Sequence, residues 1–327
     1  MNKKQVCFVH PFFVCNFFMN VSQIFYNQIG RLRSGWRLLI FLLLFICFGG
    51  LFSYAAELVI RLRGVDFAPG SILFLAVNTF VSLAAALSVG WWCGKYLEEL
   101  PFRALGAWFT KNWLKDFGLG LILGAASLML AAFIAFVFGG LSFQVNQTHG
   151  QSAILLTLGI SLLVFILGAA SEEVLYRGYI FQTLARANLA WLAILLTSLF
   201  FALAHTGNPA ASFISTLNTI LAGVWFGIAY LKTRTLWLVF GLHLAWNWFQ
   251  GAIFGMEVSG ITSLTTAPLL QEIDAGPVWL TGADYGIEGG IACTAALVIS
   301  ILVIWFSPFI KPTEEMLLLT DRENPQQ

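Results

Sequence analysis

The stretch Ile154–Ala170, ILLTLGISLLVFILGAA, is apolar and continues directly into Ser171-Glu-Glu-Val-Leu-Tyr-Arg177. A run of this kind is typical of an α-helix that crosses about 30 Å of hydrocarbon at about 1.5 Å per residue. Two carboxylates, Glu172 and Glu173, follow the run. Because an ionisable side chain at membrane depth costs roughly 2.5–3.5 kcal/mol, these residues are candidates for function.

The whole chain has the composition of a membrane protein. Of its 327 residues, 59% are hydrophobic and 10% are charged, whereas a soluble domain carries about 25% charged residues. The apolar windows predict an all-α fold, a polytopic transmembrane bundle of about eight helices. These windows are Trp36–Val59, Ser71–Cys93, Phe117–Gly139, Ala153–Ala170, Leu189–Ala204, Ser212–Leu231, Leu236–Phe254 and Gly286–Phe306. The fourth is expected to continue as a helix past Glu173.

The positions of Lys and Arg predict the orientation. With an even number of spans, all 17 positive residues except Arg61 and Arg63 fall on the same side as the two ends of the chain. Positive residues gather on the cytoplasmic side of a membrane. We therefore predict that both termini are cytoplasmic and that the protein lies in a bacterial plasma membrane.

Strong polar residues inside the apolar segments fall in three clusters. Glu173 and Arg177 are four residues apart, in the favourable order for an ion pair, while Glu172 is about 100° further round the helix and remains free for chemistry. His205 ends the next apolar segment. His243 and Asn247, again four apart, can address one point. Each cluster alone is also explained by structural pairing between helices.

Together these groups can satisfy one another only by converging. A carboxylate, two imidazoles, an amide and a guanidinium are the parts of a hydrolytic site. They supply a base for water, a second imidazole to orient it, and donors for a developing oxyanion.

The three motifs follow the order found in the CPBP family of intramembrane proteases. They are Glu172-Glu173-x-x-x-Arg177, Phe201-x-x-x-His205 and His243-x-x-x-Asn247. This family includes the eukaryotic type II CAAX prenyl endopeptidases and bacterial bacteriocin-processing and self-immunity proteins. The resemblance covers roughly residues 112–254.

This resemblance implies an intramembrane endopeptidase that hydrolyses peptide bonds of membrane-associated or lipidated substrates within the lipid bilayer. Glu172 would be the general base, assisted by His205. His243 and Asn247 would stabilise the oxyanion, while Glu173 and Arg177 would support the site. The substrate is either CAAX-type or a bacterial peptide or membrane protein, and nucleic acid is not expected as a partner.

A metal is an open question at this stage, since the family is customarily labelled metalloprotease. Glu172, His205 and His243 are the candidate zinc ligands, because three protein ligands are typical of catalytic zinc. The chain has no HExxH motif, so no helix presents two imidazoles four residues apart. We favour metal-free chemistry.

The chain divides into five regions. Residues 1–30 are an interfacial segment or reflect a mis-assigned start, and residues 31–111 hold the first transmembrane helices. Residues 112–254 are the catalytic transmembrane core, residues 255–311 an outer loop and the last transmembrane helix, and residues 312–327 a polar cytoplasmic tail.

Two other functions fit the same residues, namely a catalytically inactive scaffold or immunity protein and a proton-coupled transporter. Intramembrane carboxylates often serve ion paths, but the chain shows no internal repeat typical of transporters.

The proposed site requires that Glu172 and His205 lie close together. Glu172 is expected near the cytoplasmic end of its helix and His205 at the outward end of the next. They can meet only if the second helix starts deep in the membrane or if Thr206–Ala211 dips inward.

Overall fold

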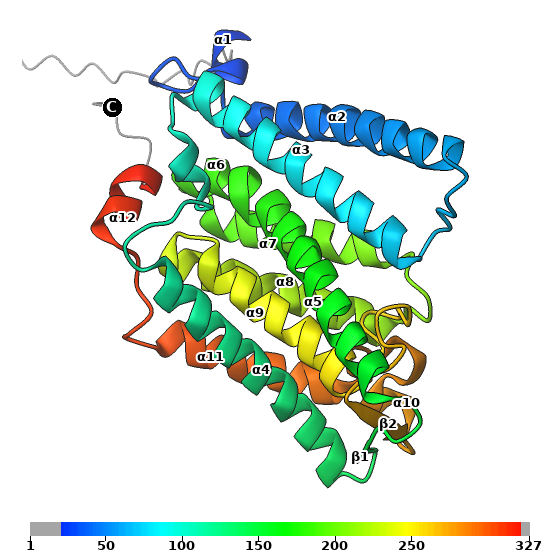
Figure 1. Cartoon of the computed structure of the whole chain (residues 1–327). Coiled ribbons are helices and arrows are strands. Elements are labelled where there is room, and N and C mark those ends of the chain that lie inside the picture. Colours follow the sequence, from blue (N-terminus) through cyan, green and yellow to red (C-terminus); the bar gives the residue numbers. More distant parts are fainter. Residues whose placement is uncertain (1–20, 322–327) are drawn as a thin grey trace, which may run out of the picture.

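The structure is a computed structural model that describes residues 21–321. Its long helices lie side by side, with α2 and α3 along one side of the bundle and α4 and α11 along the opposite side (Figure 1). The long helices are α2 (Ser34–Leu62), α3 (Ile72–Glu98), α4 (Trp113–Val137), α5 (Gln151–Glu173), α7 (Ala190–His205), α8 (Phe213–Thr233), α9 (Trp237–Trp248) and α11 (Ile291–Phe306).

Shorter elements connect these helices. The short helices are α1 (Val21–Phe25), α6 (Phe181–Arg186), α10 (Val278–Thr281) and α12 (Glu314–Thr320). The 3₁₀ turns are Phe102–Leu105, Ala283–Tyr285 and Ile287–Gly289, and the π-helical turns are Val174–Ile180 and Phe249–Ile253. The strands β1 (Leu141–Val145) and β2 (Leu270–Asp274) pair antiparallel.

The predicted all-α bundle is confirmed, and each apolar window coincides with one of the long helices. Among the described residues, five helices are long and apolar enough to cross a membrane, namely α2, α3, α4, α8 and the continuous helix Gln151–Arg186. Helices α7 and α11 are apolar but shorter.

Three details of the prediction differ from the structure. The last helix begins at Ile291, not at Gly286, because Gly286 has a φ of +82°, which no helical residue adopts. The strand pair β1–β2 was not predicted. The tail predicted as residues 312–327 contains α12, and residues 1–20 of the predicted N-terminal segment lie outside the described residues.

Regular α-helix ends at Glu173 in α5, but the chain remains helical. It continues through the π-helical turn, which is kinked at Gly178 (φ −70°, ψ −112°), into α6, so that a helical stretch of 36 residues runs from Gln151 to Arg186. The expected continuation of the helix past Glu173 is confirmed, and Glu172 lies within this stretch and not near its end. Glu172 precedes Arg186 by 14 residues (186 − 172), which is about 21 Å along a helix.

Helix α7 turns back immediately and brings His205 toward Glu172. It starts at Ala190 and packs against α6 and the π-helical turn. His205 lies 15 residues after Ala190 (205 − 190), about 22 Å along the helix. Because the two lengths are similar, the antiparallel arrangement lets both side chains reach one cavity.

Glycines set the position of α9 against α4. A Cβ on Gly120 or Gly124 of α4 would overlap the backbone carbonyls of Leu238 and Leu242, and one on Gly241 would overlap the carbonyl of Phe117. The two backbones therefore touch directly, as small residues allow in membrane helix pairs. This contact fixes the helix that carries His243.

A cap, residues 254–290, covers one end of the bundle between α9 and α11. It contains β2, whose partner β1 follows α4, and it is bound to the loop after α7 by Asn208, whose Nδ2 donates to the Ser259 carbonyl at 3.1 Å. Burial, followed by the charges of Glu257 and Asp274, raises the pKa of Glu272 in β2 to about 8.

We predict that Gly124→Ala destabilises the protein and that Gly118→Ala does not. The Gly118 position has no atom near an added Cβ, so alanine there is neutral or gains up to about 1 kcal/mol of helix propensity. Gly124→Ala forces α4 from α9, at about 1–3 kcal/mol. Thermal unfolding in detergent measures both, and equal melting temperatures would contradict backbone contact.

We also predict that Glu272 makes the protein less stable as pH rises. The folded state holds the proton up to about pH 8, whereas the unfolded chain releases it near the ordinary value of 4.5. Stability attributable to this group is thus complete below pH 4.5 and declines between these values. Glu272→Gln should flatten the pH dependence of the melting temperature. Asp66→Asn, an exposed acid between α2 and α3, is the control and should leave the slope unchanged.

Candidate active site

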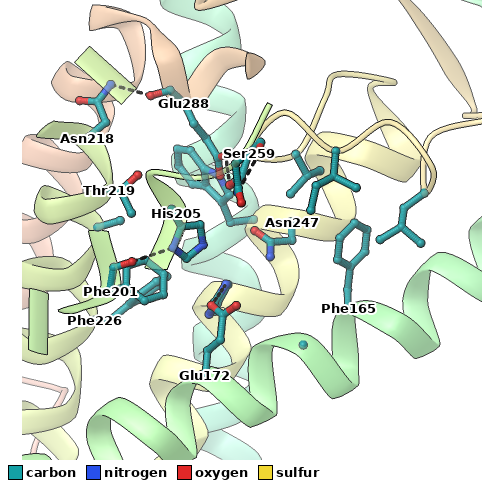
Figure 2. A pocket seen from close by; sticks show the side chains of 18 of the residues that line it. Phe165, Glu172, Phe201, His205, Asn218, Thr219, Phe226, Asn247, Ser259 and Glu288 are labelled. Atoms are coloured by element: carbon teal, nitrogen blue, oxygen red, sulfur yellow. Dashed lines mark hydrogen bonds and ion pairs between the residues drawn. The ribbon is translucent and has the colours of Figure 1, made fainter. Parts of the chain in front are cut away.

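The predicted catalytic residues line one cavity of about 160 Å³. Glu172 comes from α5, His205 from the end of α7, and His243 and Asn247 from α9. Figure 2 shows Glu172, His205 and Asn247 directed into a common space. The structure thus brings together side chains from three helices that are far apart in sequence.

Glu173 is fully buried and bonded to two partners. Its side chain is 1% exposed, and its Oε1 lies 2.8 Å from Nδ1 of His243. Arg177 Nη1 lies 3.4 Å from the same carboxylate. The Glu173–Arg177 pair expected from spacing is therefore present, but the shorter contact joins Glu173 to His243. Helical spacing could not reveal this contact, because it joins α5 to α9.

Arg177 is held in an aromatic cage. Its guanidinium carbon lies 5.1 Å from the ring centres of Phe201 and Phe226 and 5.6 Å from that of Tyr176. Its Nη2 donates to the Gly223 carbonyl at 3.1 Å. Since a buried cation needs partners to offset its desolvation, these contacts fix the position of the guanidinium and hence of the carboxylate that it contacts.

Glu172 differs from its neighbour in exposure and pairing. Its side chain is 33% exposed, and its nearest charged partner is His243, whose Nε2 lies 3.7 Å from Glu172 Oε2. This separation is too long for a hydrogen bond. His243 therefore lies between the two carboxylates, bonded to Glu173 and facing Glu172.

His205 is oriented by the backbone of its own helix. Its Nδ1 lies 2.7 Å from the carbonyl oxygen of Phe201. A carbonyl only accepts, so Nδ1 carries the proton and Nε2 of the neutral ring is an acceptor. The spacing of Phe201 and His205 is what makes this bond possible. Asn247, one helical turn after His243, directs its amide into the cavity (Figure 2).

Glu288 also reaches the cavity, although the sequence analysis did not select it. Its Oε1 accepts from Trp246 Nε1 at 3.0 Å, and its Oε2 accepts from the backbone amide and hydroxyl of Ser259 at 2.8 and 2.7 Å. These bonds join α9 to the cap. The predicted helical window Gly286–Phe306 includes Glu288, so a contact between this residue and the site was not expected. The one sequence feature that could have indicated it is an acidic residue close to two glycines, Gly286 and Gly289.

One side of the cavity is apolar. It is formed by Val164 and Phe165 of α5, Leu75 of α3, and Val258 and Leu264 of the cap. Phe165 stands apart from the polar groups in Figure 2. The cavity therefore combines a polar centre with a hydrophobic wall.

The candidate zinc ligands are Glu172, His205 and His243. Within residues 21–321, no group of three or more His, Cys, Asp or Glu side chains is placed to hold a metal ion. Nδ1 of both histidines is bonded, to Glu173 and to the Phe201 carbonyl. Metal-ligating histidines make such bonds too and bind the metal through the other ring nitrogen, so Nε2 of His205 and of His243, with Glu172, would be the atoms to hold a zinc ion.

Residues 152–249 match the family model described as type II CAAX prenyl endopeptidase Rce1-like. This segment is similar to Rce1-like endopeptidases. The match includes all three motifs and confirms the resemblance to the CPBP family of intramembrane proteases, although it covers less than a third of the chain. Searches of curated proteins and of solved structures each gave no match.

The Rce1-like domain implies a protease, and hence a hydrolase, that acts on membrane-associated peptide substrates. Together with the apolar helices, it identifies the chain as an integral membrane protein. All of the residues that converge on the cavity from α5, α7 and α9 belong to the Rce1-like segment. Leu75 of α3 and the cap lie outside it.

We predict that Arg177→Leu costs about 3–5 kcal/mol, because it leaves a buried carboxylate short of a partner. Arg61→Leu is the matched control. Arg61 also pairs with a glutamate four residues away, Glu57 at 2.8 Å, but both side chains are exposed, so its loss should cost less than about 1 kcal/mol. Thermal unfolding in detergent compares the two. Similar losses would contradict a structural role for Arg177.

Proposed function

We propose that the protein is an intramembrane endopeptidase that hydrolyses peptide bonds with a carboxylate-activated water. The observation that carries this proposal is the placement of Glu172 and His205 in one cavity, with Glu172 partly exposed and unbonded. The match to Rce1-like proteins supports the same reaction class.

The first step is attack by water. A water between Glu172 and His205 gives a proton to the Glu172 carboxylate and donates a second hydrogen bond to Nε2 of His205. Its oxygen then attacks the peptide carbonyl carbon. Two positioned acceptors make water a better nucleophile and hold it in line with the carbonyl.

The second requirement is stabilisation of the oxyanion. Asn247 donates from its amide, and His243 donates from Nε2 when both ring nitrogens carry protons. Its Nδ1–H donates to Glu173, which balances the positive charge of the imidazolium. Donors fixed in advance stabilise the developing charge without reorganisation.

Collapse of the tetrahedral intermediate breaks the C–N bond. Glu172 passes its newly acquired proton to the leaving amine and returns to the carboxylate form, so the cycle balances. Glu173 and Arg177 take no part in proton transfer and position His243.

The proposed mechanism is metal-free, with the water activated by the Glu172 carboxylate. Zinc content of purified protein, with activity after chelation and zinc addition, tests this point. The proposal expects less than one zinc per ten chains and full activity after chelation. Stoichiometric zinc and recovery only with zinc would overturn the metal-free step.

Access to the site requires movement. The cavity of about 160 Å³ is smaller than the roughly 300–1,000 Å³ typical of pockets for small molecules. A peptide therefore needs displacement of the cap or of α3. The proposed substrates are lipidated CAAX-type chains, bacterial peptides or membrane proteins, with both termini of the enzyme in the cytoplasm of a bacterium.

We predict that Glu172→Gln and His205→Ala abolish cleavage in proteoliposomes, and that Asn247→Ala lowers kcat about 10²–10³-fold. Asp284→Asn, an exposed acid of the cap, is the control and should retain activity. A folded Glu172→Gln variant that still cleaves would refute the proposed base. If the unmodified protein gave ion flux without cleavage, it would be identified as a transporter. If it gave neither activity, it would be identified as a scaffold.

A further inference from the structure

The segment between α3 and α4 presents two large aromatic side chains to the surroundings. Trp108 is 50% exposed and Phe109 is 59% exposed. They are neighbours in sequence, with ring centres 6.3 Å apart. Such exposure on adjacent residues forms a distinct apolar surface, here called the Trp108–Phe109 patch.

This patch rests on a rigid aromatic base. Phe109 lies 5.1 Å from the ring of Trp237 and 5.0 Å from that of Trp113, and these two tryptophans are 4.9 Å apart. The indole nitrogen of Trp237 donates to the Trp108 carbonyl at 2.8 Å. The exposed rings are therefore held in place before any ligand arrives, which lowers the entropy cost of binding.

Exposed lysines adjoin the patch. Lys111 and Lys115 are both exposed, and neither makes a hydrogen bond or ion pair with a described residue, although the Asp116 carboxyl is close enough to Lys115 for a Coulombic interaction. Arg103, which precedes the patch in sequence, is paired with Glu315 of α12 at 3.0 Å. Two ammonium groups beside two aromatic rings are thus free to meet an anion.

The patch lies at an end of the membrane helices. Helices α3 and α4 are both long and apolar enough to cross a membrane, and the patch connects them. Lys232 lies in the last turn of α8, Arg234 follows α8, and Lys311 follows α11. Arg234 Nη1 donates to the Thr320 carbonyl of α12 at 3.4 Å, so this end of α8 lies at the end of the bundle where α12 is found (Figure 1). The cap at the opposite end, from Glu257 to Glu288, contains acids and no Lys or Arg.

We propose that the Trp108–Phe109 patch with Lys111 and Lys115 binds anionic phospholipid headgroups of the adjoining leaflet. The rings sit at the level of the headgroups, where tryptophan is favoured, and the lysines contact the phosphate and a second anionic headgroup. A zwitterionic lipid can contact the aromatic rings, but it has no net negative charge to pair with both lysines. This proposal does not depend on the protease reaction.

An acidic protein segment is the other occupant with the right charge. The site favours lipid because its apolar element is rigid, exposed and located where two membrane helices end. A protein partner would require the rings to lie clear of the bilayer surface.

The test is a lipid titration of the full-length protein in detergent, followed by native mass spectrometry. Phosphatidylglycerol and phosphatidylcholine with identical acyl chains are the probes. Lys111→Gln with Lys115→Gln should weaken phosphatidylglycerol binding about thirtyfold, at about 1 kcal/mol per basic residue, and leave phosphatidylcholine unchanged. Trp108→Ala with Phe109→Ala should weaken both lipids.

The matched control is Arg61→Gln with Arg63→Gln. It removes two arginines at the C-terminal end of α2, away from the patch. It should retain phosphatidylglycerol affinity. Thermal unfolding checks that each variant folds, and single Lys111→Gln replaces the double variant if that one does not. Equal losses in the arginine and lysine variants would overturn the proposal. So would displacement of the lipid by polyglutamate with no effect of the aromatic substitutions, which would identify an acidic protein partner.

Discussion

The rest of the site depends on one shared carboxylate. Glu173 is 1% exposed and contacts Arg177 on its own helix and His243 on another. In a hydrophobic medium an unpaired charge is too costly to retain, so each of these groups requires the other two. The contact therefore locks α9 to α5 at one relative position, and it sets which nitrogen of His243 faces Glu172.

That lock works only because backbone packing brings the helices close enough. Direct contact between α4 and α9 requires glycine at positions 120, 124 and 241. The close approach of α8 to α7 likewise requires Gly223, where a Cβ would lie 2.6 Å from the Cα of Ser198. The Gly223 carbonyl then reaches Arg177. Backbone contacts at the glycines and the charge pairs around Glu173 thus stabilise the same relative positions of the helices.

Many features of the fold and of the site could be predicted from residue patterns, because hydropathy and four-residue spacing are local properties of the sequence. The helices, the Glu173–Arg177 pair and the grouping of His243 with Asn247 follow from them. The Glu173–His243 bond and the role of Glu288 could not, because each joins segments far apart in sequence. The depth of Glu172 was misjudged for a related reason. Continuation of the helix past Glu173 was expected, but apolar windows do not show how far it runs, since Arg177 and Gln182 interrupt the hydropathy.

The two adjacent glutamates show how stability and chemistry divide between neighbours. Glu173 has partners for its charge and is buried, so its removal would disturb the fold. Glu172 is one third exposed, faces His243 at 3.7 Å and makes no hydrogen bond with any residue from 21 to 321. A general base needs a carboxylate oxygen that is free to accept a proton. A carboxylate oxygen left free inside the bundle contributes nothing to the stability of the fold. The fold can tolerate Glu172 in this state because Glu173, Arg177 and the glycine contacts already hold the helices that surround it.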